Sequence, residues 1–560
     1  MKVRFFVILI LSSILGTMCA GISRAEGGRS FNPPDGRNVP QGKTQVVFGR
    51  VFLPVLSFQD FKGDINPQGV VSNRTFSAAL QICDETTATA CIKSVEIGIK
   101  DPITQIVNWE SGTVMPRVAQ RTWVDGKIVG NDWQPRLTST WKEDLSRNLP
   151  EGSESRFWKL PAGHAGGNMY YVGASLSGEM SSDSNGRVSI SDFKTYIAPL
   201  TSRPVFASES NPNPCPLGFF LDGGWRSSSG DCLEFYDFPE NTIYRIQIRL
   251  GSFYEQLSGW LDGRIVEPEI SISGKENLLS ISGAPTRIPV AVTTPKSIDE
   301  IQKTPEVCFL LGCNSDWHKQ LLNMNRSFGV SYFYEGNSQG VVATFEKMLP
   351  ILQERAAGMI DAWSASLLRQ SRDFAGCLSG GFSGVISSNA AVYEPIPPSW
   401  NLASGALDFK IGAPHLDSQG KVLRGYYSLK LSSLQAKCLW GADYVNAKAS
   451  VSIIDSDGTQ EVETVALNEK NGWLNFLASG FHFSSPTIRV QLTLPTRELP
   501  KQSVGPVSTV TSVPEPLPNK EIETPKKSIS LKKTITCIKG KTTKKVTGIN
   551  PKCPSGYKKK

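Results

Sequence analysis

Short runs in which apolar and polar residues alternate recur along most of the chain. Clear examples are Val46–Phe52, Tyr244–Leu250 and Thr487–Leu492. Alternation with a period of two predicts half-buried antiparallel strands. In addition, the turn-forming residues 455–458 separate two apolar runs at 451–454 and 462–465, which is the pattern of a β-hairpin. The pattern predicts a mainly β protein.

One segment departs from this alternation. Between Val342 and Arg369 the apolar residues recur mostly at spacings of three and four, with Pro350 as a point of interruption. Such spacing predicts an amphipathic helix. Packing of this helix against a neighbouring sheet is the simple interpretation, and binding to a partner is the alternative.

Three stretches interrupt the strand pattern. Residues 208–214 lack a hydrophobic period and are typical of a surface loop or subdomain joint. Residues 284–305 hold four prolines and predict a domain boundary. Residues 495–525 are rich in Pro, Val, Ser and Thr and predict an extended, semi-rigid linker. We therefore expect tandem β-sandwich-like domains: an N-terminal β region at 26–284, a second β domain at 306–494 with a helical insertion at about 342–369, a Pro-rich linker at 495–525 and a small basic hairpin tail at 526–560.

Charge is distributed unevenly along the 560 residues. Residues 526–560 contain 12 lysines and no acidic residue, whereas the whole chain has a net charge of +8. The rest of the chain is therefore acidic, at −4 by difference. An acidic body followed by a strongly basic tail indicates an attachment device.

The first 25 residues have the features of a secretory signal peptide. Lys2 and Arg4 precede an apolar run from Phe5 to Gly16, and Ser23-Arg24-Ala25 fits a cleavage site. The apolar run is shorter than the about 20 residues of a membrane span. An uncleaved N-terminal anchor and a lipoprotein modified at Cys19 are the alternatives. The sequence predicts export, to the medium or to the cell surface.

The cysteines agree with an oxidising compartment. Apart from Cys19 there are ten, and they fall into neighbouring pairs. Metal binding is the rival interpretation, but the sequence has no C-x-x-C pair and no histidine at finger-like spacing from a cysteine. We expect disulfides among neighbouring members of this set, although the sequence does not fix the connectivity: Cys83 with Cys91, Cys215 with Cys232, Cys308 with Cys313, Cys377 with Cys438, and Cys537 with Cys553.

Four short segments are familiar as a set. They are Gly259–Arg264, Gly425–Leu429, Gly472–Leu474 and the tail from Ile535 to Lys558. Together they resemble a group of uncharacterised exported proteins of actinobacteria, and the tail is the most specific of the four. The resemblance implies an exported protein of this architecture. It implies no activity and no catalytic residue.

Candidate catalytic chemistry is sparse. The four histidines form no H-x-x-x-H or H-E-x-x-H pattern, and no G-x-S-x-G motif is present. We expect no cofactor and assign no catalytic residue or metal ligand. Glycoside hydrolysis needs only two carboxyl groups on either side of a sugar bond. The alternative function is therefore an extracellular carbohydrate-active hydrolase that uses loop carboxylates around the predicted Cys215–Cys232 loop: Asp222, Asp231, Glu234, Asp237 and Glu240.

A calcium loop is a further possibility at Ser181–Asp192. Asp, Asn, Gly and a final Asp occupy EF-hand-like positions, but position 1 is Ser and position 12 is Asp instead of Glu. The flanks at 171–176 and 187–190 have strand patterns. A hairpin turn explains the same residues, and we favour that interpretation.

Tryptophans are concentrated in one region. Flat aromatic rings suit stacking on sugars or on protein partners, because they bury a large area at little entropic cost. Packing in a core explains them equally well. Five of the twelve form a candidate ligand face within 50 residues: Trp109, Trp123, Trp133, Trp141 and Trp158.

The basic tail predicts a small folded module. Thr534–Lys539 and Lys545–Ile549 have strand patterns, and so small a unit needs a covalent link such as Cys537–Cys553. Its lysines suit non-specific contacts with an anionic envelope polymer, an acidic glycan or anionic lipids. A solubilising tail is the plain alternative. We expect a non-enzymatic binding or scaffold protein, with no nucleic acid as partner, that is held at the cell envelope through these residues: Lys539, Lys541, Lys544, Lys545, Lys552 and Lys558.

Overall fold

The computed structural model divides the chain into two compact units. Met1–Thr496 form the first, called the body here, and Arg497–Lys560 form the second, called the tail unit. In the described ranges no helix has both the length and the hydropathy of a membrane span. The structure describes residues 44–48, 74–84, 90–100, 107–114, 122–124, 127–129, 143–152, 156–180, 187–203, 232–294, 330–333, 340–369, 376–377, 381–394, 396–441, 444–445, 447–454, 460–465, 468–483, 486–493, 533–539, 542–548 and 558–559.

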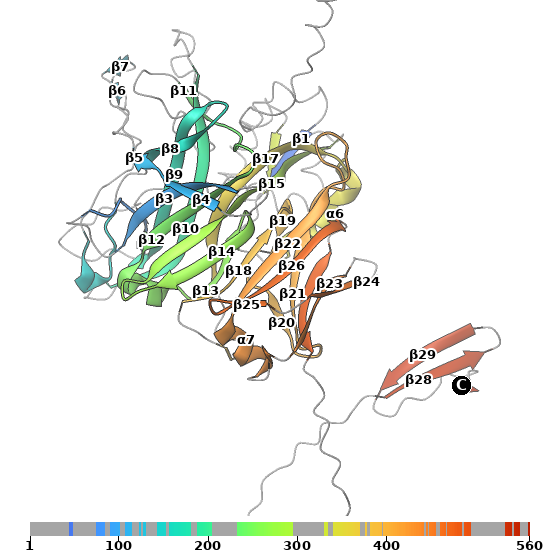
Figure 1. Cartoon of the computed structure of the whole chain (residues 1–560). Coiled ribbons are helices and arrows are strands. Elements are labelled where there is room, and N and C mark those ends of the chain that lie inside the picture. Colours follow the sequence, from blue (N-terminus) through green and yellow to red (C-terminus); the bar gives the residue numbers. More distant parts are fainter. Residues whose placement is uncertain are drawn as a thin grey trace, which may run out of the picture. The chain divides into compact units, whose positions relative to one another are not determined.

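The body is mainly β, as the sequence predicts (Figure 1). Its first sheet, called the outer sheet, is antiparallel throughout. Along β12 buried and half-buried residues alternate strictly, so one face packs inward and the other faces outward. The strands in spatial order are β4 (Val107–Ser111), β3 (Cys91–Lys100), β12 (Thr242–Arg249), the first half of β15 (Leu278–Thr294) and β14 (Ile265–Ser273).

The second sheet, called the central sheet, lies behind the outer one and contains a parallel pair, β13 with β18. Two further strands, β8 (Arg156–His164) and β11 (Cys232–Phe235), pair with β9 and β10, and β5 (Thr113–Val114) pairs with β8. The main order is β2 (Arg74–Ala79), β9 (Gly167–Met180), β10 (Val188–Arg203), β17 (Ala356–Arg369), β13 (Gly259–Gly263), β18 (Phe382–Ser388), β22 (Arg424–Ser432), β26 (Trp473–His482) and β25 (Asn468–Lys470).

The third sheet covers the other face of the central sheet. Its β23 and β24 are antiparallel, with Ser450 opposite Thr464, which confirms the predicted hairpin. The strands are β19 (Val392–Tyr393), β20 (Ser399–Asn401), β21 (Ala406–Gly412), β27 (Thr487–Thr493), β23 (Lys448–Ile454) and β24 (Gln460–Val465).

Smaller elements complete the described part of the body. They are β1 (Thr44–Phe48), β6 (Thr122–Val124), β7 (Lys127–Val129), β16 (Val330–Phe333), η2 (Leu145–Arg147), η3 (Gly251–Gln256), α6 (Val341–Met348), η4 (Leu349–Ile351) and α7 (Ser433–Trp440).

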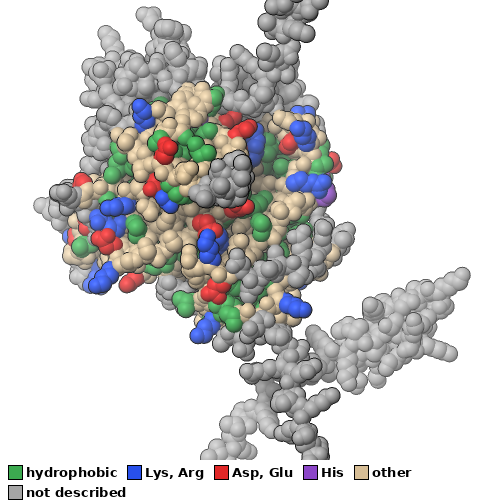
Figure 2. Space-filling view, in the orientation of Figure 1, with side chains coloured by type: hydrophobic (Ala, Val, Ile, Leu, Met, Phe, Trp, Pro, Cys, Tyr) green, Lys and Arg blue, Asp and Glu red, His purple; other side chains and the backbone are tan. Residues whose placement is uncertain are grey.

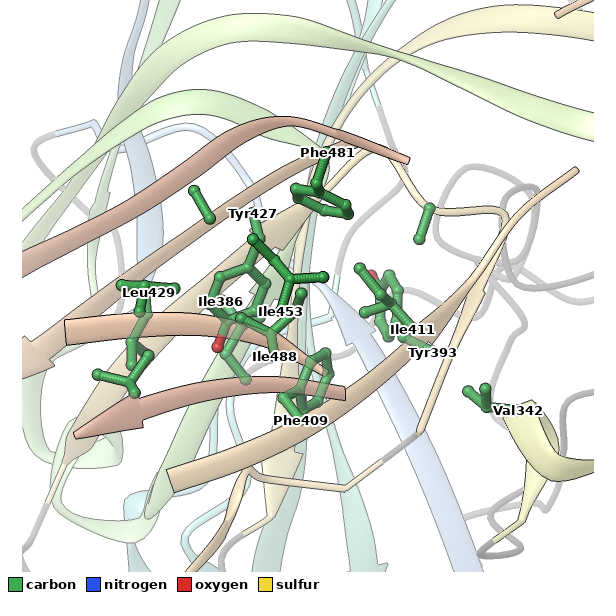
Figure 3. Close-up of a cluster of buried hydrophobic side chains, with 14 of the residues drawn as sticks. Val342, Ile386, Tyr393, Phe409, Ile411, Tyr427, Leu429, Ile453, Phe481 and Ile488 are labelled. Atoms are coloured by element: carbon green, nitrogen blue, oxygen red, sulfur yellow. The ribbon is translucent and has the colours of Figure 1, made fainter. Parts of the chain in front are cut away.

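Two hydrophobic cores lie on opposite faces of the central sheet. The first fills the space toward the outer sheet, with Tyr244 and Ile246 among its members. The second lies toward the third sheet and includes Phe409, Tyr427 and Ile488 (Figure 3). Strand β13 contributes Leu261 to the first core and Trp260 to the second, so it is buried on both faces. The parallel pairing of β13 fits this position, because parallel strands are normally covered on both sides.

The predicted helix at 342–369 is wrong over most of its length. Only α6, at Val341–Met348, is α-helical, and Pro350 lies in the short η4 that follows. The remainder is strand β17. This strand sends Ala362 and Leu368 into one core and Trp363 and Leu367 into the other. Burial on both faces removes the polar alternation that marks a strand, and the remaining apolar spacing resembles a helix.

The structure also differs from the predicted boundary at 284–305. Strand β15 runs through Ala284 to Thr294, where its second half pairs with β17 and with β1. Prolines are tolerated there because the strand changes partners, with register shifts between Pro289 and Val292. Body strands from both sides of the stretch share the central sheet, and the division into units comes only after Thr496. The predicted joint at 208–214 lies outside the described residues.

The tail unit holds one small sheet. Strand β28 (Lys533–Lys539) pairs antiparallel with β29 (Thr542–Gly548), as expected for a hairpin. A short third strand, β30 (Lys558–Lys559), pairs with the other edge of β28 at Cys537 and Ile538. The tail is therefore a three-stranded sheet instead of the two-stranded hairpin that the sequence predicts.

Candidate functional site

An open groove of about 1180 Å³ runs over the outward face of the outer sheet. Its walls come from the sheet itself, from the 238–241 segment and from β17 and the start of the β25–β26 turn. Acidic groups outnumber basic ones among the lining side chains: Glu240, Glu267, Glu269 and Asp361 against Arg245 and Lys470. Hydroxyl, amide and apolar groups complete the lining, among them Ser271, Ser280, Ser282, Asn241, Asn471, Trp109 and Ile243.

The register of the sheet sets outward residues in rows across the strands. Directly opposed residues in an antiparallel sheet have Cβ atoms about 5 Å apart, so each row is a line of neighbours. An apolar row holds Trp109, Gly98 and Ile243; a charged row holds Ser111, Glu96, Arg245, Ser282 and Glu269; a polar row holds Ser94, Gln247, Ser280 and Ser271. One face of the sheet therefore offers an aromatic ring, charges and hydroxyls in adjacent rows.

Trp109 is positioned by a glycine and by an arginine. A Cβ atom at Gly98 would lie 2.4 Å from Cγ1 of Val107 and 3.0 Å from Cε3 of Trp109, so glycine gives these two side chains room to pack across this strand. The guanidinium of Arg245 covers one face of the ring, with its Cζ 4.1 Å from the ring centroid. This arrangement is a cation–π contact. The Trp109 ring is half-buried and fixed before any ligand arrives.

Ion pairs hold the charged row in place. Arg245 Nε donates to the Glu96 carboxylate on the neighbouring strand. At the other end of the row, Lys430 Nζ lies 2.9 Å from Glu269 Oε1, and Lys470 Nζ lies 3.9 Å from Glu269 Oε2. Lys430 is almost fully buried, so its pair with Glu269 fastens the edge of the outer sheet to the central sheet.

A β-bulge shapes the end of the groove beside β14. The register between β14 and β15 shifts between Val266 and Glu269, and Glu267 there has a left-handed backbone with φ of 49°. Opposite it, Gly283 has φ of 151°, and its carbonyl accepts a hydrogen bond of 3.0 Å from Trp363 Nε1. The Glu267 N–H donates to the Tyr426 phenol oxygen at 2.6 Å. Bulges of this kind redirect side chains next to functional sites.

Asp361 is a carboxyl group in the groove lining whose pKa is raised. Burial raises its pKa, and the nearby negative charge of Asp237 acts in the same direction. Arg287, whose Nη1 lies 3.3 Å from Asp361 Oδ1, partly opposes this shift. A carboxyl group with a raised pKa in a groove is a candidate proton donor.

The predicted tryptophan face is only partly assembled. Trp109 lines the groove, whereas Trp158 is buried in the first core, where its ring has a packing role. Trp123 lies in the short strand β6. Trp133 and Trp141 lie outside the described residues. Of the five tryptophans, one therefore lines the groove, one packs in a core, and the side chains of the other three lie outside the described part of the structure.

The predicted loop carboxylates are also only partly gathered at the groove. Glu240 lines the groove, and Asp237 lies close enough to raise the pKa of Asp361. Glu234 belongs to β11. Asp222 and Asp231 lie outside the described residues.

The pairing around Ser181–Asp192 favours a hairpin turn over a calcium loop. Strands β9 and β10 pair antiparallel on either side of it, with Val188 opposite Met180. Asp192, the twelfth residue of the hypothetical calcium loop, lies within β10 and pairs with Lys194 Nζ at 2.9 Å. Residues 181–186, which would supply the first six positions of that loop, lie outside the described residues.

His164 has a structural position. Its Nδ1 accepts a hydrogen bond of 3.1 Å from the Gly166 N–H, which leaves Nε2 to donate to the Met169 carbonyl at 3.1 Å. Burial lowers the pKa of this imidazole. The ring is therefore neutral and fully used within the fold.

Two of the expected disulfides are confirmed, Cys83–Cys91 and Cys377–Cys438, with Cα atoms 5.1 Å and 5.8 Å apart. Each of the other three pairs includes a cysteine outside the described residues: Cys215, Cys308, Cys313 and Cys553. Of the predicted envelope-binding lysines, Lys539, Lys544, Lys545 and Lys558 belong to strands of the tail sheet, and Lys541 and Lys552 lie outside the described residues.

Sequence reasoning missed most of the groove. Arg245, Glu269 and Ser271 sit in segments that the alternating pattern marks as strands, so their outward orientation was predictable. Their alignment with Ser282 and Trp109 depends on the register between distant strands, which the pattern does not contain. The sequence pattern does not place Asp361 on an outward strand face, because it predicts a helix where the structure has strand β17.

In comparisons with known proteins, no family model, curated protein or solved structure matched this chain. The fold and the groove are therefore the basis of the functional argument.

Proposed function

We propose that the protein is an exported binding protein of the cell envelope that holds a glycan in the groove of the outer sheet. The observation that carries this proposal is the row arrangement, in which the ring of Trp109 lies beside lines of charges and hydroxyls. Sugars present apolar ring faces and many hydroxyl groups, so they match an aromatic surface flanked by hydrogen-bonding side chains. The cationic tail would keep the body near anionic envelope polymers.

The groove is largely prepared for a ligand. Arg245 and Glu96 hold Trp109 in position, and Lys430 holds Glu269. Side chains that are fixed in advance lose little entropy on binding. The excess of carboxylates favours neutral glycans or glycans with amino groups over acidic ones.

We expect Trp109→Ala to weaken glycan binding by about tenfold or more, because aromatic residues dominate the energy of such sites. Ser282→Trp should abolish binding by filling the centre of the groove. The measurement is a glycan array with the full chain, followed by calorimetric titration of the best ligand.

Ser273→Trp is the matched control, because Ser273 is exposed on β14 and does not line the groove. Its affinity should equal that of the unaltered chain. Glycan binding that is unchanged in both Trp109→Ala and Ser282→Trp would contradict the proposal.

A second candidate function is glycoside hydrolysis in the same groove, and the observation that favours it is the raised pKa of Asp361. A general acid must be protonated, so hydrolysis would decline as the pH rises through this raised pKa. Asp361→Asn would then reduce turnover by at least about a hundredfold while glycan affinity stays within a few fold. Binding without turnover at any pH between the usual carboxyl range and neutrality eliminates the enzyme.

A further inference from the structure

Apolar side chains are exposed at one end of the body, around α7 and the turn between β20 and β21. Only six large apolar residues are exposed in the described part of the chain, and three lie here: Leu402, Leu434 and Val445, at 85%, 73% and 56% exposure. Trp400 and Trp440 are partly buried beside them. These five residues are called the apolar patch. Hydrophobic side chains are visible in this region, with basic and acidic ones beside them (Figure 2).

Several contacts hold the apolar patch rigid. Trp440 Nε1 donates to the Gly405 carbonyl at 2.9 Å, and the Trp400 and Trp440 rings meet edge to face at 5.2 Å. The disulfide Cys377–Cys438 ties α7 to a distant part of the chain. The two Trp440 contacts join α7 to β20 and to the β20–β21 turn.

A second set of bonds fixes the segments that carry Leu434 and Val445. Glu469 accepts hydrogen bonds from Ser433 Oγ at 2.6 Å and from Tyr444 OH at 3.3 Å. The residues next to Leu434 and Val445 in the chain therefore share one carboxylate. Because these hydrogen bonds hold the backbone in place, the side chains of Leu434 and Val445 remain exposed.

The apolar patch lies near Thr493, the last described residue of the body. Strand β27 ends at Thr493, opposite Lys448, and the Gln491 amide donates to the Ser404 carbonyl at 2.6 Å, within the turn that carries Leu402. The linker and the lysine-rich tail follow in the sequence. Lys437 and Lys448 are exposed at this end.

From these observations we propose that the apolar patch docks the body onto an anionic lipid bilayer. Leucine and valine enter the boundary between headgroups and acyl chains, while the tryptophans occupy the polar interface. Lys437, Lys448 and the tail supply electrostatic attraction to the anionic headgroups. This surface is separate from the groove and does not depend on a glycan being bound there.

The test uses the full chain and vesicles of phosphatidylcholine with or without an equal share of phosphatidylglycerol. We expect binding to the anionic vesicles, and a loss of about tenfold in affinity for each leucine replaced by serine at Leu402 and Leu434. Raising the salt concentration should weaken the contribution of the lysines and leave the effect of the leucines in place. Hydrogen exchange should slow on vesicles in peptides containing Leu402, Leu434 and Val445.

Leu145→Ser is the control, because Leu145 is similarly exposed at 58% but lies in η2, outside the apolar patch. It should bind vesicles like the unaltered chain. Equal affinity for the Leu402→Ser/Leu434→Ser variant and the unaltered chain would overturn the proposal. So would protection of the same peptides by raised protein concentration without lipid, which would assign the apolar patch to self-association.

Discussion

Replacing Arg264 by alanine is expected to lower the free energy of unfolding of the body by about 3–5 kcal/mol. Arg264 is 3% exposed, and its Nη1 donates to the carbonyls of Ser388 and Ala390 at 2.8 Å and 2.5 Å. Its guanidinium stacks 4.3 Å from the centroid of the Tyr393 ring. Alanine would remove the hydrogen bonds that two buried carbonyls accept from this guanidinium and leave a cavity beside an aromatic ring, each of which is costly.

The loss would extend through the local network. The Tyr393 hydroxyl donates to the Asp262 carboxylate at 2.9 Å, and Asp262 is itself buried. The Arg264 guanidinium packs against the ring of the same tyrosine. Without it, the Tyr393 ring loses a group that holds it in position, and the hydrogen bond to the buried Asp262 is weakened. Since β13, which carries Asp262, contributes to both cores, the damage should appear as a lower midpoint of the whole body transition.

Urea unfolding followed by fluorescence measures this effect. Arg147→Ala is the control, because Arg147 is 42% exposed and pairs with Asp144 only at the surface, at 3.5 Å. Such pairs contribute about 0–1 kcal/mol. If the two variants unfold at the same urea concentration, the buried network does not stabilise the fold.

The strand content of the body was readable from the sequence because half-buried strands alternate. Strand β12 is the clearest case, since Tyr244 to Arg249 alternate both in polarity and in burial. The same rule failed for β17. That strand is covered on both faces, so Ala362 and Trp363 are both apolar and no period of two remains.

The candidate groove could be predicted only in fragments. The local pattern shows that Arg245 and Ser271 face outward. That they lie on one face depends on the pairing of both β12 and β14 with β15, which is set by the register between distant strands. The role of Trp109 depends on Gly98, more than ten residues earlier and across a strand pair. Sequence patterns describe one strand at a time, whereas the groove forms only when the five strands of the outer sheet pair in this register.

Gly283→Ala is expected to destabilise the body by about 2–4 kcal/mol. With φ of 151°, Gly283 occupies a backbone region that side chains rarely adopt. A Cβ atom there would lie 2.7 Å from the Val266 carbonyl oxygen and 3.2 Å from that of Glu267. Both neighbours are backbone atoms of the bulge, so relief requires the bulge itself to move.

Gly274→Ala separates strain from steric crowding. Gly274 has φ of 70° in the β14–β15 turn, and a Cβ atom there would have no neighbour within 4 Å. Its cost should be the backbone strain alone, about 1–2 kcal/mol. The difference between the two midpoints in urea therefore reports the crowding at the bulge together with the greater backbone strain at φ of 151°, and equal midpoints would show that the bulge yields freely.

The same variant links the bulge to the groove. Gly283, Val266 and Glu267 all line it, and Glu269 follows on the same strand. If the rigid bulge positions these side chains, Gly283→Ala should weaken glycan binding under conditions where the body remains folded, whereas Gly274→Ala should not. Because Trp363 is bonded to the Gly283 carbonyl, the displaced backbone would also disturb the first core. Loss of stability and loss of affinity are then two consequences of one displacement at the junction of the outer and central sheets.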